Sequence, residues 1–256
     1  MEVLRMLGIT ALAGMGGTGL GGAVSCLFRR DSSRTISLLL SFAAGVMVAV
    51  VCFDLLTDAL APVSAEGQTP LGLIVGGVLA GYGIICGLNA KIESRREKTE
   101  KQNRGGMFMA GVVMAAAIAL HNVPEGMVIG ASFAKEAAVG AVSRGGLMMA
   151  AVIGLHNIPE GMAVAVPLIS GGISKPKAVI TTAVTGAPTI LGAVAGYFLG
   201  TLGPRTLAVA LSLASGAMLY VVFGELLPEA SGLWQSKAPA LAAVIGMMVG
   251  MIIIYM

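Results

Sequence analysis

Long apolar stretches that contain almost no charge dominate this chain of 256 residues. Apolar residues make up 56% of the chain and charged residues 11%, whereas a soluble domain usually carries about 25% charged residues. A helix needs roughly 20 apolar residues to cross the hydrocarbon core of a bilayer. The sequence therefore predicts an all-α integral membrane protein and excludes a soluble domain of any size.

Eight stretches are long enough to span a bilayer, and turns rich in charge, proline or glycine separate them. We expect the polar segment 91–106 to be the only long loop. No linker is long enough to divide the chain, so residues 1–256 are expected to form a single transmembrane domain. The predicted spans are about 6–28, 36–60, 70–90, 107–133, 146–170, 178–200, 206–229 and 238–256.

Basic residues are distributed unequally between the two ends of these spans. Twelve of the 16 lie on the side that holds residues 29–34, 91–104, 175–177 and Lys237. Since basic loops stay in the cytoplasm, we expect a multi-pass protein of the cytoplasmic membrane with both termini outside. A net charge of +3 in short clusters excludes a nucleic-acid-binding protein. Three cysteines without C-x-x-C spacing predict no disulfide scaffold.

Six acidic residues lie inside the predicted spans, where a charge near the helix centre costs about 2.5–3.5 kcal/mol. No Lys or Arg is predicted inside a span to neutralise them. A cavity of this kind attracts cations or holds protons on its carboxyl groups. For the two acids nearest the span ends, Asp58 and Glu229, extension to the membrane surface is the alternative. The six are Asp54, Asp58, Glu125, Glu160, Glu225 and Glu229.

Both histidines of the chain belong to a hexapeptide, H-N-[VI]-P-E-G, that occurs at 121–126 and again at 156–161. A His and a Glu four residues apart lie on one face of a helix. The two faces converge if the fourth and fifth spans pack antiparallel. Four nitrogen and oxygen ligands suit Zn²⁺, and also Fe²⁺, Mn²⁺ or Co²⁺. The four predicted ligands are His121, Glu125, His156 and Glu160.

Asn122 and Asn157 of the same motifs are further candidates, either as oxygen ligands or as hydrogen-bond donors to the ligands. The motif prolines, Pro124 and Pro159, are expected to bend both helices. The motifs lie about halfway along their spans, which predicts a site near the bilayer midplane. For one motif alone, the alternative to a metal site is a purely structural role, in which the polar side chain forms hydrogen bonds between helices. The recurrence of His and Glu in phase favours a metal site.

A second internal repeat relates residues 44–59 to residues 215–230 at an offset of 171. Gly, Met, Val, Leu-Leu, Ala and both acidic positions coincide. The second span therefore resembles the seventh, as the fourth resembles the fifth, and the spans of each pair run in opposite directions. This pattern predicts an inverted repeat with the substrate bound at the midplane.

The repeat also predicts an access route for a divalent cation. Asp54 and Asp58 would lie toward the outer mouth, and Glu225 and Glu229 toward the inner mouth. The glycine motifs at 77–81, 192–200 and 246–250 are packing motifs. They suit a tight bundle or a homodimer face, and the sequence does not choose between these.

The paired H-N-x-P-E-G motifs in the fourth and fifth of eight spans resemble those of the ZIP (Zrt/Irt-like) metal transporters, particularly the bacterial GufA-like branch. The resemblance covers essentially the whole chain. It implies a 3+2+3 helix arrangement and uptake of zinc, iron, manganese, cobalt or cadmium into the cytoplasm, with the metal as cargo and not as a cofactor. Asp54 and Glu225 are implied on the access route. The implied metal-binding residues are His121, Asn122, Glu125, His156, Asn157, Glu160 and, as a soft ligand, Met47.

The sequence departs from the family pattern in the sixth span. Many members carry a glutamate there that helps to form a second metal site, whereas residues 185–192 contain no acid. A full two-metal site is therefore not expected, and the alternative is a second metal held more weakly by Asn122, Asn157 and the shared carboxylates.

Two other functions could use the same residues. An intramembrane metalloenzyme needs an activated water and a general base, but H-E-x-x-H is absent, so no enzyme is predicted. A proton-coupled carrier of organic solutes could relay protons through Glu125 and Glu160. The second histidine and the lack of cationic or aromatic substrate contacts argue against it.

Overall fold

The structure is a computed structural model that describes residues 2–27, 33–61, 69–102, 106–138 and 144–255. All regular elements in these ranges are helices, and the label η marks a π-helical turn. In chain order they are α1 (Glu2–Ala11), η1 (Leu12–Gly16), α2 (Gly17–Ser25), α3 (Ser33–Ala49), η2 (Val50–Leu55), α4 (Leu56–Leu60), α5 (Leu71–Gln102), α6 (Gly106–Ala138), α7 (Arg144–Ser170), α8 (Lys175–Thr185), α9 (Pro188–Thr201), α10 (Pro204–Tyr220), η3 (Val221–Leu226), α11 (Leu227–Leu233) and α12 (Ala238–Tyr255).

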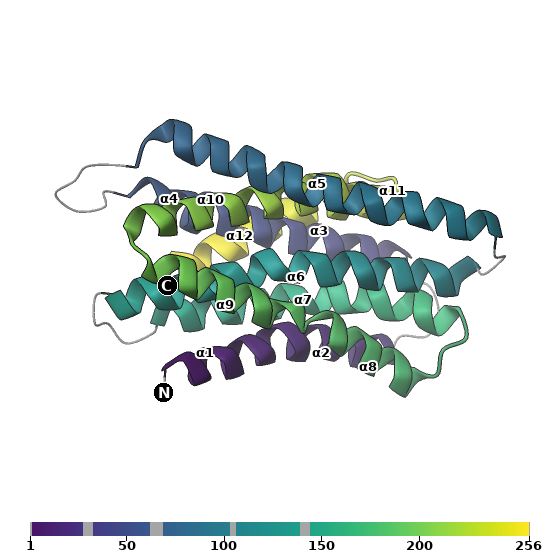
Figure 1. Ribbon diagram of the computed structural model, residues 1–256. Helices are drawn as coiled ribbons and strands as arrows, with labels where there is room; N and C mark the ends of the chain where they lie inside the picture. The colour runs from purple at the N-terminus through teal and green to yellow at the C-terminus, as the bar shows by residue number, and fades with distance from the viewer. Residues whose placement is uncertain (1, 28–32, 62–68, 103–105, 139–143, 256) are drawn as a thin grey trace.

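Seven helical stretches among the described residues are long and apolar enough to cross a membrane. They form one elongated bundle with α6 (Figure 1). The prediction of a helical membrane protein is confirmed, while the eighth span, the 3+2+3 arrangement and the single domain stay predictions. The seven stretches are Val3–Ser25, Ser33–Leu60, Leu71–Ala90, Gly145–Ser170, Lys175–Thr201, Pro204–Leu233 and Ala238–Tyr255.

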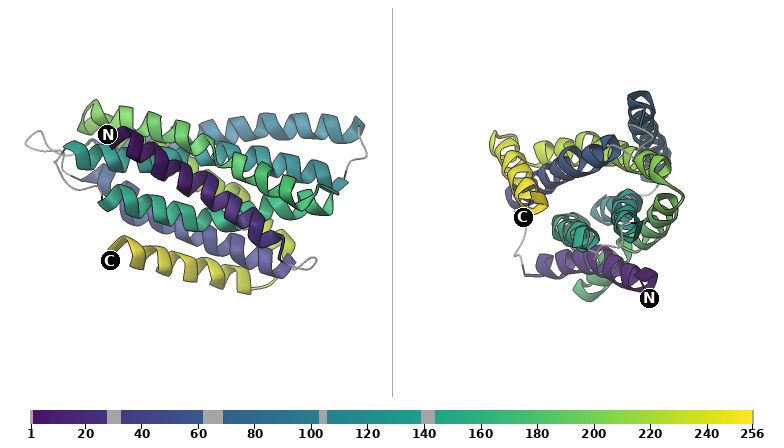
Figure 2. Two further views of the ribbon diagram at one scale, coloured as in Figure 1. Left: turned by 90° about the horizontal axis from the view of Figure 1, so that it is seen from below. Right: turned by 90° about the vertical axis from the view of Figure 1, so that its left-hand side faces the viewer.

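Helices α6 and α7 pack antiparallel, as the motif spacing requires. Seen along the bundle, they lie between α1 and α2 on one side and a layer of α3, α5, α10 and α12 on the other (Figure 2). Helix α1 begins and α12 ends at the same end of the bundle (Figures 1 and 2). This end also holds the end of α4 and the junction of α9 with α10.

The polar segment expected to be a loop is largely helical, so that prediction was wrong. Helix α5 continues through residues 91–102 to Gln102. The segment is rich in Lys, Arg, Glu and Gln, contains no glycine or proline, and has high helix propensity. Only residues 103–105 separate it from α6, and they lie outside the described residues. The predicted turns at 29–34 and 62–70 also lie mostly outside them.

The irregular backbone lies at positions other than the motif prolines, where bends were expected. Helices α6 and α7 both continue through their motif prolines. The sixth predicted span is instead interrupted at Gly186 and Ala187, between α8 and α9. Glycine followed by a proline at position 188 is a helix-breaking signal, and it could have been read from the sequence.

Glycines bring α6 and α9 into backbone contact. A Cβ atom at Gly192 would clash with the carbonyl oxygen of Val123, and one at Gly196 would clash with that of Met127. On α6, Gly126 meets the backbone of Thr189 in the same way. Small residues permit such close approach of membrane helices. The 192–200 motif therefore packs the bundle itself.

We expect Gly192→Val to lower the stability of the folded protein by about 1–3 kcal/mol, because overpacking a tight contact forces backbone shifts. Gly83→Val is the matched control, since a Cβ atom there meets nothing within 4 Å. Thermal unfolding of the detergent-solubilised variants measures the difference. Equal midpoints for the two variants would contradict the described packing of α6 on α9.

Candidate metal centre

Three of the four predicted ligands come together between α6 and α7. Ligand atoms of Glu125, His156 and Glu160 all lie within 4.8 Å of one another. Nε2 of His156 is 2.9 Å from Oε1 of Glu125. All three side chains are fully or almost fully buried. Two carboxylates and one imidazole at this spacing are a set of donors suited to a divalent transition metal.

The fourth predicted ligand, His121, faces a different acid. Its Nε2 lies 2.8 Å from Oε2 of Glu225, which belongs to η3. Glu225 was predicted on the access route, and the structure places it directly against a motif histidine. Position along the chain could not reveal this contact, because it depends on the packing of α10, which continues into η3, against α6.

The amide of Asn157 is surrounded by more acceptors than it can satisfy. Its Nδ2 lies 3.3 Å from the carbonyl oxygen of Ala13 and 3.4 Å from Oδ1 of Asn122. The other end of the amide lies 3.1 Å from Oε2 of Glu125 and 3.2 Å from Oε2 of Glu160, where a nitrogen would also donate. With its nitrogen turned to this end, the amide donates to both carboxylates. With its oxygen turned to this end, the amide oxygen and the two carboxylates face one another, an arrangement that a cation between them would stabilise.

Asn122, in contrast, is fully engaged in hydrogen bonds. Its Nδ2 donates to the carbonyl oxygens of Ile118 at 2.9 Å and Thr185 at 3.1 Å. Its Oδ1 accepts from Oγ1 of Thr189 at 3.0 Å and from Nδ2 of Asn157 at 3.4 Å. The amide thus ties α6 to both sides of the break between α8 and α9. These bonds leave no unpaired amide atom for a second metal ion.

Among the described residues, no ion pair joins an acid of the site to a Lys or Arg. In the part of the chain that the structure describes, the ion pairs of Glu125 and Glu225 are to histidines alone. Oε1 of Glu160 and Oε1 of Glu225 have no hydrogen-bond partner there. Unsatisfied buried polar atoms are rare in folded proteins. The presence of several unsatisfied carboxylate oxygens in this one place indicates a cation-binding site.

Asp54, Asp58 and Glu229 are not members of this group of three ligands. Asp58, on α4, forms an ion pair with Lys135 at the end of α6, with 2.5 Å between Oδ2 and Nζ. Asp54 is half-buried on η2, and Glu229 is half-buried on α11. Met47 is completely buried within the hydrophobic core, and its role as a ligand stays a prediction.

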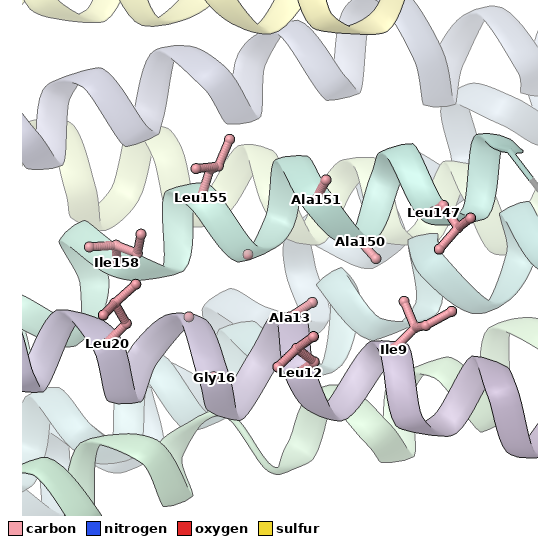
Figure 3. Close-up of a pocket in the computed structure, with 12 residues that line it drawn as sticks. Ile9, Leu12, Ala13, Gly16, Leu20, Leu147, Ala150, Ala151, Leu155 and Ile158 are labelled. Atoms are coloured by element: carbon pink, nitrogen blue, oxygen red, sulfur yellow. The ribbon is translucent and has the colours of Figure 1, made fainter.

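A groove of about 750 Å³ lies between α7 and the helices α1, η1 and α2. Figure 3 shows Leu20 opposite Ile158 and Ile9 opposite Leu147. All twelve lining residues are apolar or glycine, so the groove offers no side-chain ligand for a metal ion.

The fold and this site together define a multi-pass membrane protein with a buried, acidic and histidine-containing cation site. The chain belongs to the ZIP zinc transporter family, since residues 87–256 match the family model described as ZIP Zinc transporter. The zinc transporter ZupT of Chlorobium luteolum is 34% identical over 255 residues, which cover 94% of this chain and 93% of that protein. ZupT of Escherichia fergusonii is 31% identical over 249 residues, covering 94% and 92%.

Family membership confirms the predicted function at its general level. The protein is a transporter of divalent metal ions and not an enzyme, and the metal is its substrate and not a cofactor. It is a multi-pass protein of the cytoplasmic membrane.

We expect Thr189→Val to lower the stability by about 1 kcal/mol, because it removes a buried hydroxyl that donates to Asn122. Thr201→Val, on the same helix, removes an exposed hydroxyl that donates to Phe198 and should change little. Thermal unfolding in detergent compares the two variants. A Thr189→Val protein as stable as the control would show that the Asn122 hydrogen bonds do not hold α6 against α9.

Proposed function

We propose that this protein carries divalent transition-metal ions, zinc first among them, across the cytoplasmic membrane into the cytoplasm. The ion binds to Glu125, His156 and Glu160. The observation that carries this proposal is the burial of these three side chains with ligand atoms within 4.8 Å of one another. A cation offsets the charge of these two buried carboxylates, because no ion pair among the described residues joins either of them to a Lys or Arg.

One ion occupies the site at a time. Asn157 supplies a fourth ligand by directing its Oδ1 at the metal, since that end of its amide lies within 3.2 Å of both carboxylates. Asn122 is a positioning residue, because its amide atoms are hydrogen-bonded to α6, α8 and α9. The carboxylate and imidazole donors also accept iron, manganese, cobalt or cadmium, so metal selection depends on geometry and availability.

The ion passes from an outer acidic pair, Asp54 and Asp58, to the site and then toward Glu225 and Glu229. His121 contacts Glu225 at 2.8 Å and so links the site to the inner half of this route. Zinc binds to neutral imidazole and to carboxylate groups. Each step along the route therefore exchanges one such ligand for another of similar kind. Met47 is retained as a candidate soft ligand on the same route.

The proposed topology has eight spans in a 3+2+3 arrangement, with α6 as the span additional to the seven, and both termini outside. This orientation is supported by the basic residues concentrated in the last part of α5 and at the start of α8. It is also supported by the position of the start of α1 and the end of α12 at one end of the bundle. A homodimer stays a prediction.

We expect proteoliposomes that contain the wild-type protein to take up Zn²⁺, and Glu160→Gln to reduce uptake at least about tenfold, because a metal ligand loses its charge. Glu136→Gln is the matched control. Its carboxylate accepts from the N–H groups of Gly145 and Gly146, and glutamine keeps an acceptor oxygen there. Uptake measured with a zinc-sensitive dye inside the vesicles compares the three proteins.

Unchanged uptake by a folded Glu160→Gln protein would remove this residue from the site. Absence of uptake by the wild type, under conditions in which zinc binds to it, would contradict transport itself.

The topology is tested with single cysteines in a protein whose Cys26, Cys52 and Cys86 are changed to Ala. We expect a membrane-impermeant maleimide to label Leu202→Cys, which lies between α9 and α10, on intact cells. Lys175→Cys, at the start of α8, should be labelled only after permeabilisation. The reverse labelling pattern would invert the proposed orientation.

A further inference from the structure

The two sequence repeats recur in the irregular parts of the backbone. The π-helical turns η2, at Val50–Leu55, and η3, at Val221–Leu226, are related at both ends by the same offset of 171 that relates the sequences of the second and seventh spans. The same offset carries η1, at Leu12–Gly16, to residues 183–187, which include the break between α8 and α9. π-helical turns are rare and often functional, so their shared register indicates duplicated structural units.

Packing contacts of the motif helices are duplicated as well. A Cβ atom at Gly21 would clash with the carbonyl oxygen of Ile158, and one at Gly192 would clash with that of Val123. The first glycine maps onto the second by the offset of 171, and Ile158 maps onto Val123 by the motif offset of 35. The helix pair α2–α7 therefore repeats the helix pair α9–α6.

The contacts of the motif asparagines follow a similar relation, displaced by one residue. Asn122 donates to the carbonyl oxygen of Thr185, beside the break that follows α8. Asn157 is 3.3 Å from the carbonyl oxygen of Ala13, in η1. In both repeats the motif asparagine thus joins its helix to an irregular turn of an outer span, α6 to the break between α8 and α9, and α7 to η1. The repeats together pair His121 with His156, Glu125 with Glu160, Glu225 with Asp54 and Glu229 with Asp58.

The contacts of the two histidines break this equivalence. Nε2 of His121 lies 2.8 Å from Oε2 of Glu225. The equivalent contact would join His156 to Asp54, but Nε2 of His156 lies instead 2.9 Å from Oε1 of Glu125. Among the described residues no ion pair joins Asp54 to His156. The two halves share their helices and turns but differ in the partner of the histidine.

We propose that the protein has a second conformation in which Asp54 is the partner of His156, as Glu225 is the partner of His121 in this one. The inference rests on the proposed function, because it concerns the same site. In the second conformation His156 leaves Glu125 and turns to the outer acidic pair, while His121 leaves Glu225. Asp54 is thus a positioning residue that directs a motif histidine toward the outer mouth.

Similar free energies of the two conformations follow from the duplicated packing. If the two repeats exchange their conformations, each helix contact is replaced by the equivalent contact of the other repeat. Both conformations therefore contain the same kinds of helix contact. Conformations within a few kcal/mol of one another are both populated, and inverted repeats commonly provide alternating access in this way. The partner of each histidine then reports which mouth the site faces.

Cross-linking tests the proposal without measuring flux. In a protein with Cys26, Cys52 and Cys86 changed to Ala, three cysteine pairs are treated with 1,2-phenylenedimaleimide in membranes. Asp54→Cys with His156→Cys reports the second conformation. His121→Cys with Glu225→Cys reports the conformation described. Asp54→Cys, on η2 directly before α4, with Glu229→Cys, on α11, is the control, because α4 and α11 lie toward opposite ends of the bundle (Figure 1). Trypsin digestion and mass spectrometry identify linked fragments.

We expect the rate of linking of the Asp54–His156 pair to be at least about a tenth of the rate of the His121–Glu225 pair. The cross-linker traps the second conformation each time it forms, so even a minor conformation is detected. The control pair should remain unlinked. The proposal is overturned if the His121–Glu225 pair is linked to completion while the Asp54–His156 pair is not linked. It is also overturned if the His121–Glu225 pair fails to link or if all three pairs link equally.

This readout separates the present inference from the proposed function. Zinc uptake by the wild-type protein combined with an unlinked Asp54–His156 pair would reject only the exchange of partners. Loss of wild-type uptake despite linking of this pair would reject transport and leave the two conformations in place.

Discussion

The burial of Glu125 and Glu160, which no ion pair joins to a Lys or Arg among the described residues, is the constraint on which the rest of the site depends. A carboxylate removed from water loses several kcal/mol of solvation, and an ion pair or a bound cation must replace it. The structure supplies one imidazole, from His156 at 2.9 Å from Glu125, and leaves Oε1 of Glu160 unpaired in the region described. The electrostatics of the site therefore favour a cation, as its proposed role in divalent metal transport requires.

Close helix packing makes that burial possible. Glycines let the backbone of α9 touch that of α6, and Asn122 then reaches across the break to Thr185 and Thr189. The repeated halves hold their motif helices in the same way, but Lys135 disturbs the equivalence because its counterpart is Ser170. Its ion pair with Asp58 is 52% exposed on the lysine side, so it is expected to bias the two conformations by no more than about 1 kcal/mol.

The sequence was sufficient for the parts of the site that depend on helical spacing. The interval from His156 to Glu160, and the same interval in the other motif, predicted one ligand face per helix. Antiparallel packing of α6 and α7 brought three of the four side chains together. The contact between His121 and Glu225 depends on a π-helical turn and on packing between distant helices, which spacing does not encode. Helix propensity predicts the continuation of α5 through residues 91–102. The polarity of this segment favoured a loop instead, which was the wrong prediction.

The most direct test of the central claim is a zinc-bound crystal structure with anomalous scattering measured at the zinc absorption edge. The account predicts a single strong anomalous peak per chain, bounded by side-chain atoms of Glu125, His156 and Glu160. A peak bound elsewhere with these three residues unligated, or two equally strong peaks that share Asn122, would contradict it.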